Sequence, residues 1–310
     1  MPENTAPTRV GLVLAAAGLA MALGIGGASI GHAAEYELKK VKLPSGTTVA
    51  YRDWTKGAWG KGRIPVVFVH GYSLSLRTWD RVADKLPKRY RAYAYDLRGF
   101  GDSEHSGQYS YETHEKDMLA FLDAMKLDSA VIVGHSMGAN ILQGFVLKNP
   151  KRVKAMILAD ASARLIAPPD PVANRVAERL ALYGDAAANR KVFEIGMPRY
   201  FDKENIKPGE IEDWMKVGLK ADTNALKDML SANYSLKPIP ASEFAGVKIP
   251  VLIVNGVHDA FSNPAHVTAM SDAMPHAAVS LIGGTGHTPM WEKPDVWSDT
   301  VYGWMDKNVK

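Results

Sequence analysis

A serine between two glycines is the strongest sign of chemistry in this sequence. Ser136 lies in the pentapeptide Gly134-His135-Ser136-Met137-Gly138, after an apolar, β-branched run and before a stretch compatible with a helix. Strand, sharp turn and helix are the context of a nucleophile elbow, in which the flanking glycines make room for a serine backbone at positive φ. We therefore expect the Ser136 hydroxyl to be exposed at the carboxyl end of a strand, where it can attack a carbonyl carbon.

A serine hydroxyl needs a base, and the base needs a group that orients it. His287 lies in a glycine-rich segment after the last predicted strand, and Asp259 follows the strand before that one. The chain order Ser136, Asp259, His287 is the order expected for a nucleophile on an elbow. Asp160 also ends a predicted strand and is the alternative orienting carboxylate, although capping of a turn would equally explain it. We predict a triad of Ser136, His287 and Asp259.

Acyl transfer through a serine also requires two N–H donors for the negative oxygen that forms on the carbonyl. One is expected to be the backbone N–H of Met137, directly after the nucleophile. The other is expected in the loop that follows the third strand, with the Tyr72 N–H as donor and Gly71 allowing the backbone to approach closely. His70 is predicted to brace this loop.

A substrate pocket is predicted from aromatic and methionine side chains between residues 162 and 247 and after His287. Residues of this kind could line an apolar acyl or aryl pocket, or equally form a hydrophobic core. The residues favoured for substrate binding are Tyr200, Phe201, Trp214, Met290 and Trp291, with Tyr183, Phe193, Met197 and Met215 as further candidates.

No cofactor is predicted. Residues 96–103 combine glycines with an arginine but lack the Gly-Lys-Ser/Thr ending of a phosphate-binding loop, so a tight turn beside the site is the favoured interpretation. His258, Asp259 and His266 are possible metal ligands by type, but nothing in the sequence completes a site. The chain contains no cysteine, which excludes disulfides and thiolate chemistry.

The elements that must position these residues follow an alternating pattern. A hairpin is predicted at 36–54, and later strands alternate with helices, which is typical of a mainly parallel sheet with helices on both faces. Residues 162–247 break the alternation with helical patterns only, and we interpret them as a cap inserted after the sixth strand. The predicted α/β fold has eight strands, formed by a core of residues 35–161 and 248–310; the further strands are expected at 65–69, 91–96, 130–133, 155–160, 250–255 and 278–282.

The first 34 residues differ from the rest, with a short polar start and then a long apolar or small-residue run. We interpret residues 1–34 as a secretory signal peptide cleaved near Ala33 or Ala34, with an uncleaved membrane anchor as the competitor. The protein is therefore expected to be exported, either periplasmic or secreted. The net charge of +4 is scattered over the 310 residues, which argues against nucleic-acid binding. A small molecule is the expected partner, and no protein partner can be inferred.

These positions together resemble the α/β-hydrolase superfamily, in particular its cap-bearing branch of esterases, lactonases and haloperoxidase-like hydrolases. The resemblance runs from about residue 36 to the end and includes the elbow, His70-Gly71, the turn at 96–103 and Gly286-His287. Relatives that are dehalogenases or epoxide hydrolases use an aspartate nucleophile, whereas this chain has Ser136.

The resemblance therefore implies hydrolysis of an ester or lactone of a small, largely apolar substrate through an acyl-serine. Carbon–carbon bond hydrolysis or perhydrolysis by the same triad is an alternative. A ligand-binding or sensor protein with little turnover is the alternative of another class.

Overall fold

The computed structural model describes residues 36–54, 62–172, 174–218 and 220–310. The predicted signal peptide at 1–34 lies outside the described residues. Among the helices that are described, none has the length and apolar character needed to cross a bilayer.

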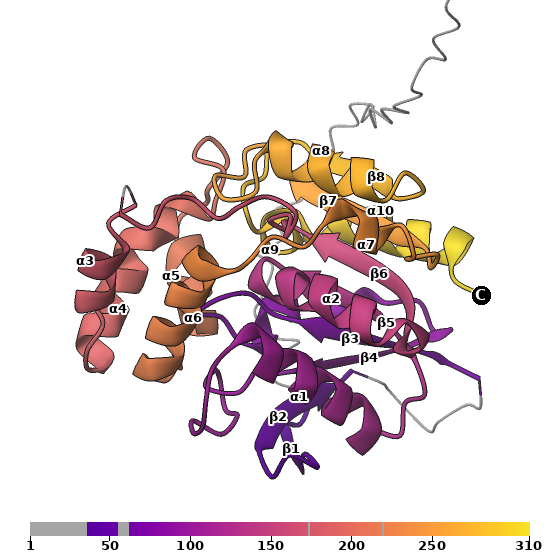
Figure 1. Ribbon diagram of the computed structural model, residues 1–310, viewed down its shortest axis with the longest axis horizontal. Helices are drawn as coiled ribbons and strands as arrows, with labels where there is room; N and C mark the ends of the chain where they lie inside the picture. The colour runs from indigo at the N-terminus through magenta and orange to yellow at the C-terminus, as the bar shows by residue number, and fades with distance from the viewer. Residues whose placement is uncertain (1–35, 55–61, 173, 219) are drawn as a thin grey trace, which may run out of the picture.

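An eight-stranded sheet forms the centre of the protein (Figure 1), with the strand order β1-β2-β4-β3-β5-β6-β7-β8. The first hairpin pairs antiparallel, β2 pairs antiparallel with β4, and every later pair is parallel. The eight-stranded, mostly parallel sheet predicted from the sequence is confirmed. The strands are β1 (Lys39–Lys42), β2 (Thr48–Asp53), β3 (Ile64–Val69), β4 (Tyr90–Tyr95), β5 (Ala130–His135), β6 (Val153–Ala159), β7 (Val251–Gly256) and β8 (Ala278–Ile282).

Alternate side chains of the central strands enter two separate cores, because successive residues of a strand point to opposite faces. Val67 and Val69 of β3 pack in the core that also contains residues of α1, α2 and α8. Val66 and Phe68 pack in the other core, with residues of α10. Both faces of the sheet are therefore covered by helices. These helices are α1 (Tyr111–Ala124), α2 (Met137–Lys148), α8 (Pro264–Ala273) and α10 (Pro294–Asn308).

Between β6 and β7 the chain contains helices and no described strand. The segment contacts the sheet domain through the turn at 96–103, where Phe100 forms an isolated bridge with Ala221 and the Asp222 N–H donates to the Gly99 carbonyl at 2.8 Å. Figure 1 places α3 to α6 together at one end of the sheet. The inserted helices are α3 (Val176–Ala181), α4 (Ala186–Gly196), α5 (Glu210–Gly218), α6 (Thr223–Ser235) and α7 (Ala241–Phe244).

Short elements complete the fold, and one helix was not expected from the sequence. Helix α8 begins at Pro264, and the Asn263 side chain accepts the N–H of Ala265. An Asn followed by Pro is a helix-start signal that the sequence does contain. The remaining elements are α9 (Pro289–Glu292) and the 3-10 helices η2 (Leu76–Trp79), η3 (Ala83–Lys85), η4 (Pro150–Arg152) and η5 (Met197–Arg199).

Candidate active site

Ser136 occupies a strained turn between β5 and α2. Its φ of 51° and ψ of −116° lie in a region that non-glycine residues rarely adopt, and α2 begins at the next residue. The two flanking glycines make this turn possible. A Cβ on Gly134 would lie 2.6 Å from the backbone of Ala139, and a Cβ on Gly138 would lie 2.5 Å from the Val69 carbonyl oxygen. The local sequence thus places the Ser136 side chain at the carboxyl end of β5.

A buried carboxylate–imidazole pair lies beside the same sheet edge. The His287 Nδ1 is 2.8 Å from the Asp259 Oδ2, and the two side chains are 3% and 0% exposed. The Asp259 Oδ1 accepts the N–H groups of Phe261 at 2.7 Å and Ser262 at 3.0 Å. Burial alone would raise the pKa of Asp259, but His287 and these N–H donors outweigh it, so its pKa lies below the ordinary value. Asp259 therefore stays ionised and holds the proton of His287 on Nδ1.

Asp160 lies next to this pair in a different state. Its Oδ1 accepts the N–H of Gly256 at 2.9 Å, and its backbone has a positive φ of 49°. Complete burial and the neighbouring charge of Asp259 raise the pKa of Asp160 well above its usual range. Asp160 therefore holds its proton to a higher pH than an ordinary aspartate, and Asp259 is the carboxylate that hydrogen-bonds His287.

The loop that carries His287 is held by hydrogen bonds that were not predicted from the sequence. The His287 N–H donates to the Tyr200 carbonyl at 2.7 Å, and its own carbonyl lies 2.8 Å from the His135 Nε2. Burial lowers the pKa of His135 to about 3, so this ring is neutral and donates from Nε2. The Glu292 Oε1 accepts the N–H of Gly286 at 2.9 Å. Nothing in the local sequence of Glu292 reveals this role, which depends on α9 returning to the loop.

The loop after β3 passes beside Ser136 and carries Tyr72, which lines the same cavity. The His70 Nε2 accepts the N–H of Leu97 at 2.9 Å, and its Nδ1 donates to the Gly71 carbonyl at 2.8 Å. Burial lowers the pKa of His70 to about 4, which fits a neutral bracing residue. A Cβ on Gly71 would lie 3.1 Å from the Ser136 Cβ, so this loop passes directly against the nucleophile.

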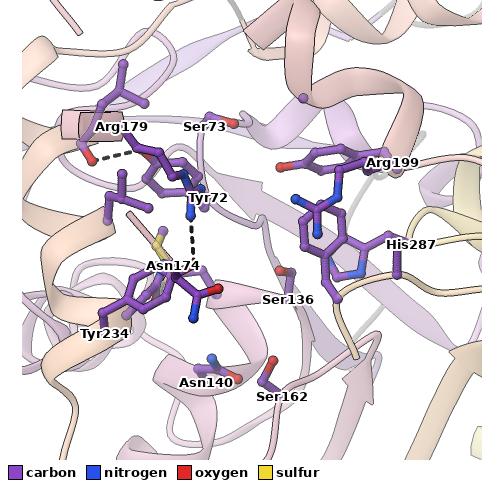
Figure 2. A pocket seen from close by; sticks show the side chains of 18 of the residues that line it. Tyr72, Ser73, Ser136, Asn140, Ser162, Asn174, Arg179, Arg199, Tyr234 and His287 are labelled. Carbon is purple, nitrogen blue, oxygen red and sulfur yellow. Dashed lines mark hydrogen bonds between the residues drawn. The ribbon is translucent and has the colours of Figure 1, made fainter. Parts of the chain in front are cut away.

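A cavity of about 780 Å³ contains Ser136, His287, Tyr72 and Met137 in its lining. Figure 2 displays Ser136 and His287 facing this cavity beneath the inserted helices. Among the described residues the Ser136 hydroxyl makes no hydrogen bond to His287; such bonds often tighten only when substrate binds. Since α2 begins at Met137, the N–H groups of its first turn have no partner within the helix and are available to an anion.

The predicted pocket residues divide into two groups. Tyr200 lines the cavity, as do Tyr183, Phe193 and Met197. The other predicted residues are not among those that line the cavity, although most of them share a hydrophobic cluster with Phe193 and Met197. Large apolar side chains pack against one another where the inserted helices meet the core, and sequence alone does not separate that packing from a pocket wall. The residues concerned are Phe201, Trp214, Trp291 and the further candidate Met215, in one hydrophobic cluster, and Met290, in a core of the sheet.

The described residues contain one group of side chains with the donor types of a metal site. One ligand atom from each of Asp160, Asp259 and His287 lies within 4.8 Å of the others. The atoms of Asp259 and His287 are hydrogen-bonded to each other, and burial raises the pKa of Asp160 and favours its protonated form, so the contacts are those of an acid–imidazole pair. His258 does not join it, since its Nδ1 lies 3.1 Å from Asp202. His266 accepts the N–H of Ala163 at 3.1 Å.

Known proteins share this architecture. A family model described as the alpha/beta hydrolase fold matches residues 64–294. A non-heme chloroperoxidase from Streptomyces lividans is 30% identical over 260 residues, covering 79% of this chain and 88% of the relative. Lipase 1 of Psychrobacter immobilis is 27% identical over 275 residues, covering 86% of this chain and 83% of the relative. The structure of a thermophilic esterase from Thermogutta terrifontis aligns with a TM-score of 0.75 at 24% identity, covering 88% of this chain and 100% of that chain.

Proposed function

Because this chain belongs to the α/β hydrolase fold family, we propose that it is a serine hydrolase that cleaves carboxylic ester or lactone bonds. The observation that carries the proposal is the 2.8 Å contact between His287 and Asp259 in the cavity that Ser136 also lines. The contact occupies Nδ1 of the imidazole and leaves Nε2 as the atom that can accept a proton from Ser136.

In the first half of the reaction the Ser136 oxygen attacks the carbonyl carbon, and its proton passes to the Nε2 of His287. The carbonyl oxygen becomes negative and is stabilised by the backbone N–H groups of Tyr72 and Met137. Collapse of this intermediate breaks the ester C–O bond, and the departing alkoxide takes the proton from His287. The products of this half are a free alcohol and an acyl-serine; a lactone leaves its alcohol attached to the acyl group.

In the second half water attacks the acyl-serine while His287 takes one of its protons. The second intermediate collapses, Ser136 regains a proton from His287, and the carboxylic acid departs. Asp259 remains ionised throughout and stabilises the protonated imidazole, for which its low pKa suits it.

The test is the variant Ser136→Ala. Serine hydroxyl and alanine methyl differ by one oxygen, so the fold should be retained while turnover of p-nitrophenyl esters falls by at least about 10³-fold. A fluorophosphonate probe should label the unmodified protein and leave the variant unlabelled. Turnover that persists in Ser136→Ala would contradict the nucleophile, whereas absence of labelling in the unmodified protein would favour the ligand-binding alternative.

A second activity is favoured by one observation, the 30% identity to a non-heme chloroperoxidase over most of both chains. If hydrogen peroxide replaces water in the second half of the reaction, the acyl-serine yields a peracid in place of a carboxylic acid. This activity requires the same acyl-serine, so peracid formation from an ester and hydrogen peroxide should vanish in Ser136→Ala together with hydrolysis.

We also propose that the mature enzyme acts outside the cytoplasm. The support is the sequence of residues 1–34, with its apolar run and the small residues Ala33 and Ala34 at its end. Mass spectrometry of the protein purified from its native host should find an amino terminus near residue 34 or 35. An intact Met1 in a membrane fraction would favour an anchor.

A further inference from the structure

The charged side chains that line the cavity beside Ser136 are all arginines among the described residues. Among the described residues its lining contains no aspartate or glutamate, whereas four arginines contribute to its wall. The four are Arg164, Arg179, Arg190 and Arg199. Arg164 and Arg179 are half-buried, Arg190 and Arg199 are exposed, and an apolar substrate would offer none of them a polar contact.

Two of these arginines are paired with carboxylates outside the cavity. The Arg164 Nη1 lies 3.0 Å from Glu115, whose side chain is only 5% exposed. The Arg190 Nε lies 2.8 Å from Glu194, one turn further along α4. Their charges are therefore largely balanced by the protein itself.

Arg199 has no carboxylate partner among the described residues. Its guanidinium carbon lies 4.7 Å from the centre of the Phe261 ring, and the Phe261 and His287 rings are also 4.7 Å apart. Stacking on Phe261 fixes the plane of the guanidinium while leaving its N–H groups available. Figure 2 places Arg199 on the His287 side of the cavity, near Ser136 in that view.

The backbone ties Arg199 to the catalytic loop. The next residue, Tyr200, accepts the His287 N–H at 2.7 Å through its carbonyl oxygen. The Tyr200 and His287 rings also contact each other, with centroids 5.5 Å apart. The backbone beside Arg199 is thus tied to the loop that carries the imidazole.

Of the four arginines that line the cavity, Arg179 is the second that has no carboxylate partner among the described residues. Its Nη1 donates to the Tyr234 hydroxyl at 2.7 Å, and Figure 2 places it across the cavity from Arg199. Unlike Arg199, it is anchored to α6 of the inserted helices and has no contact with the His287 loop.

We propose that the ester or lactone substrate carries a carboxylate and that Arg199 binds it. The proposal rests on the serine hydrolase function above and replaces the largely apolar substrate expected from the sequence. A guanidinium offers parallel N–H groups that match the two oxygens of a carboxylate. Because Arg199 is positioned against His287 through Phe261 and Tyr200, it fixes the carboxylate, and hence the scissile carbonyl, relative to the catalytic groups.

The test compares charged and neutral esters of matched shape. On the acyl side the pair is p-nitrophenyl hydrogen glutarate and p-nitrophenyl glutaramate. On the alcohol side the pair is meta-acetoxybenzoate and meta-acetoxybenzamide. The measured quantity is the ratio of kcat/KM for the anionic ester to that for its neutral partner, in the unmodified protein and in Arg199→Met. Arg190→Met is the matched control because it removes the same charge from a residue already paired with Glu194.

We expect the unmodified protein to prefer the anionic ester in at least one pair. We expect Arg199→Met to lower that ratio by about tenfold or more, as loss of a hydrogen bond to a charged group does. Arg190→Met should leave the ratio within about twofold, since its charge is already balanced. A preference for the neutral ester in both pairs, or equal ratios in the two variants, would overturn the proposal.

Loss of the preference in Arg179→Met but not in Arg199→Met would also overturn it, because the carboxylate would then lie on the opposite wall. Failure of the underlying function has a different signature. In that case the unmodified protein hydrolyses none of these esters and is not labelled by a fluorophosphonate.

Discussion

Replacement of Asp259 by asparagine changes one atom and should disable the base. The Phe261 and Ser262 N–H groups both point at Oδ1, so the asparagine must present its carbonyl oxygen to them. Its NH₂ group then faces the Nδ1 of His287, which has to accept a hydrogen bond where it now donates one. The imidazole proton moves to Nε2, and that nitrogen can no longer take the proton of Ser136.

The expected size of the effect follows from this inverted tautomer. The same exchange in the serine protease triad costs about 10⁴-fold in kcat, equivalent to about 5.4 kcal/mol of activation free energy. We expect a similar loss here for p-nitrophenyl ester hydrolysis, with KM changed far less. Circular dichroism and thermal melting should find the fold retained, because the Phe261 and Ser262 N–H groups keep their acceptor and only the 3.3 Å hydrogen bond from the Asn255 Nδ2 is lost.

Asp160→Asn is the matched control for this experiment. Burial and the charge of Asp259 favour the protonated, uncharged form of Asp160, and an asparagine oxygen can still accept the Gly256 N–H. The kcat of the Asp160→Asn variant should therefore stay within about tenfold of the kcat of the unmodified protein, since no charge beside the imidazole is lost. If Asp160→Asn were the more damaging of the two substitutions, the orienting carboxylate would have to be reassigned to Asp160.

Three further outcomes are expected, each from one local feature. Among the described residues neither ring nitrogen of the buried His114 has a hydrogen-bond partner, and burial lowers its pKa to about 3. Below the unfolded pKa of about 6.5 the unfolded chain therefore binds a proton that the folded chain does not, so stability falls as the pH falls. His114→Leu should flatten a plot of Tm against pH from 7 to 4. Asp160 is the opposite case, because its raised pKa makes the folded chain hold the extra proton. Asp160→Asn should therefore gain stability relative to the unmodified protein as the pH rises from 4 to 8. A difference in unfolding free energy that stays constant over this range would contradict the raised pKa. Gly138→Ala should destabilise the folded protein by about 1–3 kcal/mol and abolish ester hydrolysis, because its Cβ would meet the Val69 carbonyl oxygen. Gly303→Ala in α10 is the control, because a Cβ there meets nothing within 4 Å. Urea titrations should find that variant as stable as the unmodified protein or more stable.

Local sequence is enough to predict the sheet and the elbow. The strands β3, β5 and β7 are continuous apolar runs because both of their faces are buried, and a run of that kind carries its own signal. Ser136 can be recognised because Gly134 and Gly138 satisfy a steric demand within the pentapeptide itself. The chain order of Ser136, Asp259 and His287 is enough to predict the other two members of the triad, since each of the three follows a strand whose carboxyl end lies at one edge of the sheet.

Other properties depend on residues far apart in the chain that only the folded structure brings together. Trp214 and Trp291 pack against each other with ring centroids 5.1 Å apart, and no local pattern distinguishes that contact from a pocket wall. The choice between Asp259 and Asp160 likewise requires the fold, since both end strands. His287 and backbone N–H groups lower the pKa of Asp259, whereas burial and the charge of Asp259 raise the pKa of Asp160. Residue types and their order therefore determined which chemistry this chain can do. The electrostatic field and the packing at each position decided which groups perform it, and both arise only when distant segments of the chain meet.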